Sequence, residues 1–203
     1  MNGMRSLLVL GAAVLLGGAE PHRHHVHQDA ATTTEKRTLP GTSLYQLRAA
    51  LRAEDGSTVG LDVHRGAPVF VSMFYGTCPH ACPAIIASLK RIEAKLDPET
   101  RARARFLLVS FDAERDDPVM LRGLMESHKL DRARWRMAAA DARAAQEIAA
   151  VLGVRFKKHP DGSFTHTSVI TLLDGDGVPV AATEDMAGAA EEMVPKAVAI
   201  PRG

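Results

Sequence analysis

Apolar runs and helical periodicities alternate along most of the chain. Residues 69–75 and 106–111 are almost continuously hydrophobic, which is typical of short strands buried on both faces of a parallel or mixed sheet. Over 83–96, apolar residues recur at steps of three and four, which predicts an amphipathic helix that Pro98 stops. A buried strand followed by an amphipathic helix is typical of an α/β fold.

The segments on either side extend this pattern. An Asp-Asp-Pro segment at 116–118 supplies a cap and a first-turn proline for a helix, and Asp-Gly-Asp-Gly at 174–177 predicts a tight turn. In chain order we predict a hairpin from 44–51 and 58–62, a strand over 69–75, a helix over 83–96, a strand over 106–111, helices over about 117–128 and 141–152, strands over 164–173 and 178–183, and a helix over 188–199. This order predicts an α/β protein with a mixed central β-sheet flanked by helices and preceded by an N-terminal β-hairpin.

The amino terminus has the pattern of a targeting segment. Residues 6–19 carry no charge, follow Arg5, and end in small residues before Glu20. This run is shorter than the roughly 20 residues that a membrane-spanning helix needs. We therefore predict a signal peptide over 1–19, with an uncleaved N-terminal anchor as the alternative. No cysteine follows the apolar run, which excludes bacterial lipidation there. Either alternative places the folded domain in the periplasm or another extracytoplasmic space, and on a membrane only if the segment is uncleaved.

Residues 20–41 are polar and without apolar periodicity, so we predict a flexible linker ahead of a folded domain over 42–203. The linker is rich in histidine. Such a cluster can hold a copper or zinc ion loosely, or it can simply form a polar mature terminus, and the sequence leaves both open. Its histidines are His22, His24, His25 and His27.

The composition and the absence of certain motifs argue against several classes of function. The chain has 25 Lys and Arg against 24 Asp and Glu, a formal net charge of +1, and only 4% aromatic residues. A protein with neither a net basic field nor aromatic stacking platforms is not expected to bind nucleic acid. Neither a glycine-rich phosphate loop nor a nucleophile elbow occurs in the sequence, so nucleotide-binding and hydrolase functions have no support.

The chemistry is concentrated in two cysteines. Cys78 and Cys82 lie four positions apart, between a predicted buried strand and the helix after it. If the helix begins near Cys78, both thiols emerge on one face, at a helix amino terminus that favours the thiolate. The pair can form a reversible disulfide or clamp a soft metal ion. A purely structural disulfide is the weaker hypothesis, because closing so short a loop adds little stability.

A metal would need a third ligand. His166 is the best candidate, since it begins a predicted strand of the central sheet. Thioredoxin-like redox proteins usually carry a proline facing their cysteines before that strand, so a histidine at this place would converge on the pair. A Cys2His set suits cuprous and cupric copper, and also zinc. His80 lies between the cysteines and could tune them or reach a metal, although its side chain is expected to point away from the shared face. The remaining histidines of the folded domain suit ordinary structural roles: His64, His128 and His159.

Three motifs together resemble the Sco/SenC family. They are Gly-Thr-Cys78-Pro-His-Ala-Cys82-Pro after a buried strand, Val-Ser-Phe-Asp-Ala-Glu-Arg-Asp-Asp-Pro at 109–118, and Phe-Thr-His166-Thr-Ser before a strand and an Asp-Gly turn. The resemblance covers about residues 40–198. It implies a thioredoxin-like fold that binds one copper ion through Cys78, Cys82 and His166. Family members deliver copper to, or reduce the cysteines of, the binuclear copper centre of cytochrome c oxidase.

Two functions follow as hypotheses. The first is a copper chaperone, a metal-transfer protein rather than an enzyme, whose partners are a copper-accepting subunit of cytochrome c oxidase and a copper donor or thiol reductant. The alternative is a periplasmic thiol-disulfide oxidoreductase that uses Cys78 and Cys82 alone. The charged segment 112–117 could dock a partner, but helix capping and a solvated loop account for it more simply.

Overall fold

The computed structural model describes residues 38–78 and 81–202. The predicted signal segment, its histidine-rich continuation and His80 lie outside these ranges. None of the helices in the described ranges combines the length and the hydrophobicity that crossing a bilayer requires.

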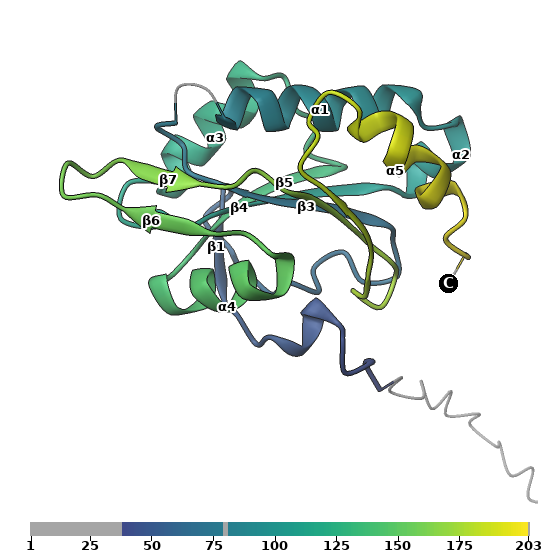
Figure 1. Ribbon diagram of the computed structural model, residues 1–203, viewed down its shortest axis with the longest axis horizontal. Helices are drawn as coiled ribbons and strands as arrows, with labels where there is room; N and C mark the ends of the chain where they lie inside the picture. Colours follow the sequence, from purple (N-terminus) through teal and green to yellow (C-terminus); the bar gives the residue numbers. More distant parts are fainter. Residues whose placement is uncertain (1–37, 79–80, 203) are drawn as a thin grey trace, which may run out of the picture. The chain divides into compact units, whose positions relative to one another are not determined.

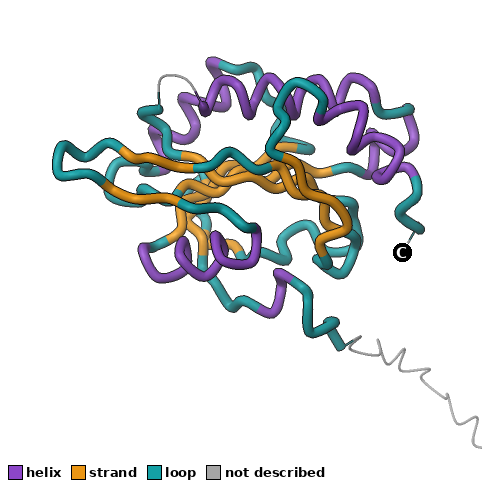
Figure 2. The backbone as a smooth tube through the Cα atoms, viewed as in Figure 1, coloured by secondary structure: helices purple, strands orange, loops and turns teal. Residues whose placement is uncertain are grey.

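A seven-stranded mixed sheet forms the centre of the domain (Figures 1 and 2), which confirms the predicted architecture. Its strand order is β2-β1-β5-β4-β3-β8-β9, and β3, β4 and β5 run parallel while their outer neighbours pair antiparallel. The strands are β1 (Leu51–Ala53), β2 (Thr58–Val59), β3 (Val69–Phe74), β4 (Arg105–Ser110), β5 (Trp135–Ala140), β8 (Ile170–Leu173) and β9 (Pro179–Thr183). β3 and β4 are buried along almost their whole length, as their apolar runs predict.

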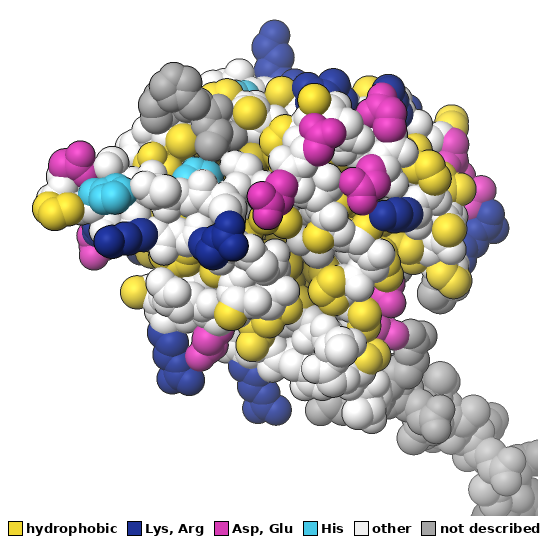
Figure 3. Space-filling view, in the orientation of Figure 1, with side chains coloured by type: hydrophobic (Ala, Val, Ile, Leu, Met, Phe, Trp, Pro, Cys, Tyr) yellow, Lys and Arg dark blue, Asp and Glu magenta, His cyan; other side chains and the backbone are white. Residues whose placement is uncertain are grey.

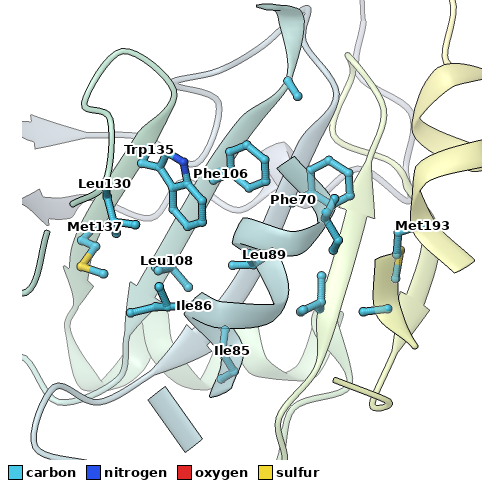
Figure 4. Packing of buried hydrophobic residues seen from close by; sticks show 14 of the residues in the cluster. Phe70, Ile85, Ile86, Leu89, Phe106, Leu108, Leu130, Trp135, Met137 and Met193 are labelled. Carbon is cyan, nitrogen blue, oxygen red and sulfur yellow. The ribbon is translucent and has the colours of Figure 1, made fainter. Parts of the chain in front are cut away.

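Helices cover both faces of this sheet. The side chains of α1, α3 and α5 share one apolar cluster with the sheet, and those of α4 and of the 3-10 helix η1 share the other. On the first face, the rings of Phe70, Phe106 and Trp135 stack in series beneath α1 (Figure 4), with centroids 5.3 and 4.4 Å apart. The helices are η1 (Leu44–Gln46), α1 (Ala81–Lys95), α2 (Pro98–Arg103), α3 (Pro118–Ser127), α4 (Ala142–Leu152) and α5 (Ala189–Val198).

Some predicted boundaries are wrong for local reasons. The N-terminal hairpin is shorter than predicted, because Leu44–Gln46 forms a 3-10 turn capped by the Ser43 hydroxyl. α1 ends at Lys95, and Pro98 then opens the short helix α2 after the Asp97 cap. β5 is a strand that the hydrophobic pattern does not predict. Its alanine-rich sequence lacks strand propensity, yet pairing with β4 and β1 buries it.

The predicted strand over 164–173 is two strands in two sheets. β7 (Phe164–His166) pairs with β6 (Phe156–Lys158) in a separate two-stranded hairpin, and only β8 belongs to the central sheet. The prediction that His166 begins a central strand is therefore wrong, since it ends β7. The exposure pattern accounts for the break: residues of β7 alternate between half-buried and exposed, whereas every residue of β8 is buried.

Candidate functional site

The loop after β3 carries Cys78 to the carboxyl end of the parallel strands. The Cys78 amide donates a hydrogen bond to the Tyr75 carbonyl at 3.2 Å, which closes a tight turn. Within this turn, a Cβ atom on Gly76 would lie 2.5 Å from the Met120 methyl carbon and 2.7 Å from an Asp116 carboxyl oxygen. Only glycine therefore allows the loop to pass so close to α3.

Cys82 lies in the first turn of α1, which begins at Ala81 rather than near Cys78. The condition under which both thiols would emerge on one helix face, a helix that begins near Cys78, is therefore not met. The Cys82 side chain is 3% exposed and packs into the cluster beneath α1, while Cys78 is half-buried in the preceding loop. The two residues carry thiols and are not joined by a disulfide.

His166 faces Cys78. The His166 Nε2 atom lies 4.0 Å from the Cys78 sulfur, and its Nδ1 atom lies 3.1 Å from the Thr167 carbonyl oxygen. A carbonyl can only accept, so this contact places a ring proton on Nδ1; in the neutral ring the Nε2 lone pair then faces Cys78. That is the arrangement in which an imidazole serves as a metal ligand.

Aromatic rings surround the imidazole. Tyr75 and Phe111 meet the His166 ring edge-on, with centroids 5.6 and 5.4 Å away. Phe164 packs against both of these rings at 5.0 and 5.1 Å. The Tyr75 hydroxyl also hydrogen-bonds the Cys78 thiol; burial first and this bond second raise the pKa of Tyr75. These walls fix the imidazole and limit its contact with water.

Burial decides the protonation of Cys82. Loss of hydration, followed by the charges of Cys78 and Asp116, raises the pKa of the Cys82 thiol to about 12. A helix amino terminus is expected to lower the pKa of the thiol. At Cys82 the effect of burial is larger, so the pKa is raised. A proton must leave Cys82 before its sulfur can bind a metal.

Asp116 is a residue near the site that sequence reasoning placed in a solvated loop. Its side chain is instead fully buried and accepts hydrogen bonds from the Gly76 amide at 2.7 Å and from the Ser110 hydroxyl. Its other carboxyl oxygen is buried without a hydrogen-bond partner among the described atoms. Burial is the largest influence on the pKa of Asp116 and raises it. Asp116 lies among other charged residues, so nothing in its local sequence indicates that its side chain is buried.

Asp117 has the predicted capping role, whereas Asp112 is buried and paired. Asp117 caps α3 by accepting from the Met120 amide at 2.8 Å, as predicted. Asp112 is 2% exposed and pairs with Arg115, whose guanidinium also donates to the Gly162 carbonyl. Asp112 and Arg115 therefore join the loop after β4 to the β6–β7 hairpin.

The other described histidines lie away from the cysteines. His128 caps the end of α3, and His159 bonds Thr165 across the β6–β7 hairpin at 2.7 Å. His64 precedes β3, near Arg105 and Arg136 at the amino ends of β4 and β5. Since β3 and β4 are parallel, that is the end of the sheet opposite Cys78.

The donor set fits a soft metal ion in its chemistry: two thiols and an imidazole with an available Nε2. Within residues 38–78 and 81–202, however, no three side chains of His, Cys, Asp or Glu are already arranged to hold a metal. Cys78 and His166 are together, so a three-ligand site requires the Cys82 sulfur and this pair to come closer than they lie here.

Comparison with known proteins gives a consistent picture. The family model described as SCO1/SenC matches residues 42–200. A protein of Stutzerimonas stutzeri, named for an expected binding of copper, is 26% identical over 111 residues, which are 52% of this chain and 53% of that protein. The chain thus matches about half the length of this curated relative.

Solved structures resemble the fold as well. ScoI of Bradyrhizobium japonicum, solved with copper bound, is 21% identical, with a TM-score of 0.64 over 75% of this chain and 97% of that chain. BsSco, described as having a disulfide switch and as a member of the Sco family of cytochrome c oxidase assembly proteins, is 20% identical. Its TM-score is 0.63 over 74% of this chain and 90% of that chain.

Proposed function

The chain belongs to the SCO1/SenC family, and on that premise we propose that it binds one copper ion through Cys78, Cys82 and His166 and delivers it to a copper-accepting subunit of cytochrome c oxidase. The observation that carries the proposal is the Nε2 lone pair of His166 directed at the Cys78 sulfur, 4.0 Å away. We place this activity outside the cytoplasm, because residues 1–19 have the pattern of a signal segment or anchor.

Binding and release are ligand exchanges accompanied by proton transfer. Each thiol loses a proton when its sulfur binds copper and regains one when the copper leaves. Because the pKa of Cys82 lies at about 12, that sulfur binds copper less tightly at neutral pH than an exposed thiol would. A ligand that takes back its proton readily suits a protein whose cargo must leave again.

A thiol-disulfide exchanger is the second candidate, because Cys78 and Cys82 both carry thiols and lie only four positions apart. In that reaction the half-buried Cys78 thiolate would attack a client disulfide and form a mixed disulfide with the client. Cys82 would then attack the Cys78 sulfur and release the reduced client. Two electrons would pass to the client, and Cys78 and Cys82 would end as a disulfide. His166 has no required part in this exchange, so it separates the two candidates.

The test compares copper retention in four variants of the reduced protein. We expect about one copper per chain in the unmodified protein, and none held tightly after Cys78→Ser or Cys82→Ser. His166→Ala should weaken copper binding by about 10-fold or more, since even loss of a group that orients a ligand costs about 10–100-fold. His159→Ala removes a histidine from the same hairpin and should bind copper normally. Competition with a chelator of known affinity measures each binding constant.

The outcomes distinguish the functions. If His166→Ala binds copper like the unmodified protein and also reduces a client disulfide at the unmodified rate, the exchanger is the better assignment. If both cysteine variants keep a tight, stoichiometric copper ion, the proposed site is wrong.

A further inference from the structure

A recess of about 590 Å³ opens beside the β6–β7 hairpin. It lies between this hairpin, the loop after β4 and the first turn of α4. Its floor is formed by the rings of Phe111, Phe156 and Phe164, and its edge includes Ala142, Gln146 and Lys157. We call it the hairpin groove. Its volume lies within the range of about 300–1,000 Å³ that is usual for binding sites.

The floor of the hairpin groove is also the wall around His166. Phe111 stacks on Phe156 with centroids 4.5 Å apart, and it meets the His166 ring at 5.4 Å. Phe156 lies directly opposite His166 in the β6–β7 ladder. An occupant of the groove would therefore rest on the residues that hold the candidate copper ligand.

The charges at the edge favour one kind of occupant. Three carboxylates line the groove, and each has a partner. Glu114 pairs with Lys158 at 2.5 Å, Asp112 pairs with Arg115, and Asp141 caps α4 by accepting from the Ala144 amide. Lys157 is exposed, and the part of the chain that the structure describes offers it no acidic partner. On the surface shown in Figure 3, the hairpin region carries histidine and basic side chains together with acidic ones. An apolar floor beside an unengaged cation fits an apolar side chain that lies next to a carboxylate.

We propose that the hairpin groove docks the copper-accepting protein, by binding an extended segment of that partner in which an apolar side chain neighbours an acidic one. This inference rests on the proposed function. Ligand exchange requires both metal sites to come within bonding distance, so the partner must cover the surface beside His166. The groove is a recess next to that surface, because Phe111 and Phe164 line it and also pack around His166. Its apolar floor supplies an anchor position for the partner.

The test fills the groove without touching a proposed ligand. Ala142 is exposed in the first turn of α4 at the edge of the groove, and Ala150 is exposed on the same helix outside it. Ala142→Trp therefore blocks the groove, and Ala150→Trp is the matched control. The probe is the copper-free soluble copper-accepting domain of the oxidase subunit from the same organism, mixed with copper-loaded protein. The second-order rate of copper transfer is measured at low and high salt.

We expect Ala142→Trp to slow transfer by about 10-fold or more, as loss of a central anchor contact does, and Ala150→Trp to change it less than about twofold. Lys157→Glu should slow transfer most at low salt, where charge attraction is least screened. Copper affinity should stay unchanged in all three variants.

Each contrary result has a distinct meaning. If the unmodified protein transfers copper but Ala142→Trp does so as fast as Ala150→Trp, the groove is not the docking site and the proposed function stands. If the unmodified protein binds copper but transfers none to this domain, delivery itself is wrong and the docking proposal falls with it. If Ala142→Trp changes only a concentration-dependent self-association in sedimentation, the occupant is a second copy of the chain, which overturns the proposal.

Discussion

The side chain of Asp116 connects two parts of the site. One carboxyl oxygen accepts from the Gly76 amide in the Cys78 loop and from the Ser110 hydroxyl at the end of β4. The same residue contributes to the raised pKa of Cys82, although burial of that thiol contributes more. A buried negative charge beside a cysteine disfavours the thiolate, because like charges repel strongly where water is excluded.

Removing that charge should therefore make Cys82 more acidic. In a Cys78→Ser background, only Cys82 titrates as a thiol, and its thiolate can be followed by the pH dependence of its alkylation by iodoacetamide. We expect Asp116→Asn in this background to lower the pKa of Cys82 relative to that in Cys78→Ser alone, and to raise its thiolate fraction at alkaline pH. Glu114→Gln, an exposed carboxylate on the same loop that pairs with Lys158, should leave the titration unchanged. An unaltered titration in Asp116→Asn would leave burial alone to account for the raised pKa.

Residues such as Asp116 mark a limit of what the sequence can predict. Cys78, Cys82 and His166 could be singled out because their chemistry and spacing are visible in the sequence. Asp116 and Phe111 could not, since their importance depends on which segments meet in space. From its sequence neighbours, Asp116 is expected to be exposed to solvent. Only the structure shows that the loop containing Gly76 packs against it.

Among the secondary-structure elements, the β6–β7 hairpin positions His166. The hairpin lies outside the central sheet and contacts the body through its aromatic residues, above all the Phe156 ring stacked on Phe111 with planes inclined by 8°. Sequence patterns predict the buried strands β3 and β4 well, because a short, continuously apolar run between turn residues is typical of a strand covered on both faces. They miss β5 and the hairpin because neighbours, rather than intrinsic propensity, determine those strands.

Loosening the hairpin should therefore misplace the imidazole. We expect Phe156→Ala to weaken copper binding severalfold or more, because the ring supports both Phe111 and the strand opposite His166. Truncating a partly buried aromatic ring should also lower the free energy of unfolding, by less than the roughly 3–5 kcal/mol typical of a core phenylalanine. Lys157→Ala, on the same strand with an exposed side chain, is the control for copper affinity. Chelator competition and urea unfolding give the two quantities; normal copper affinity in Phe156→Ala would show that the hairpin is held by other contacts.

At the scale of the whole molecule, the sheet separates the site from an unrelated titrating group. The cysteines and His166 lie at the carboxyl end of β3, and His64 lies near the amino ends of β4 and β5. The Nε2 atom of His64 is buried without a hydrogen-bond partner among the described atoms. Burial first, and then the charges of Arg105 and Arg136, lower the pKa of His64 from 6.5 to about 4.

This lowered pKa predicts an acid-dependent loss of stability that is independent of copper. Between pH 6.5 and about 4 the unfolded chain binds a proton at His64 and the folded chain does not, so the free energy of unfolding falls as the pH falls. The full shift corresponds to about 3 kcal/mol, and solvent screening of this half-buried ring reduces that to about 1–2 kcal/mol. Urea unfolding at pH 7 and pH 4.5 should therefore show a smaller pH-dependent loss in His64→Gln than in the unmodified protein. His159→Gln, on the hairpin, serves as the control. Equal losses in all three proteins would mean that carboxylates alone govern acid unfolding.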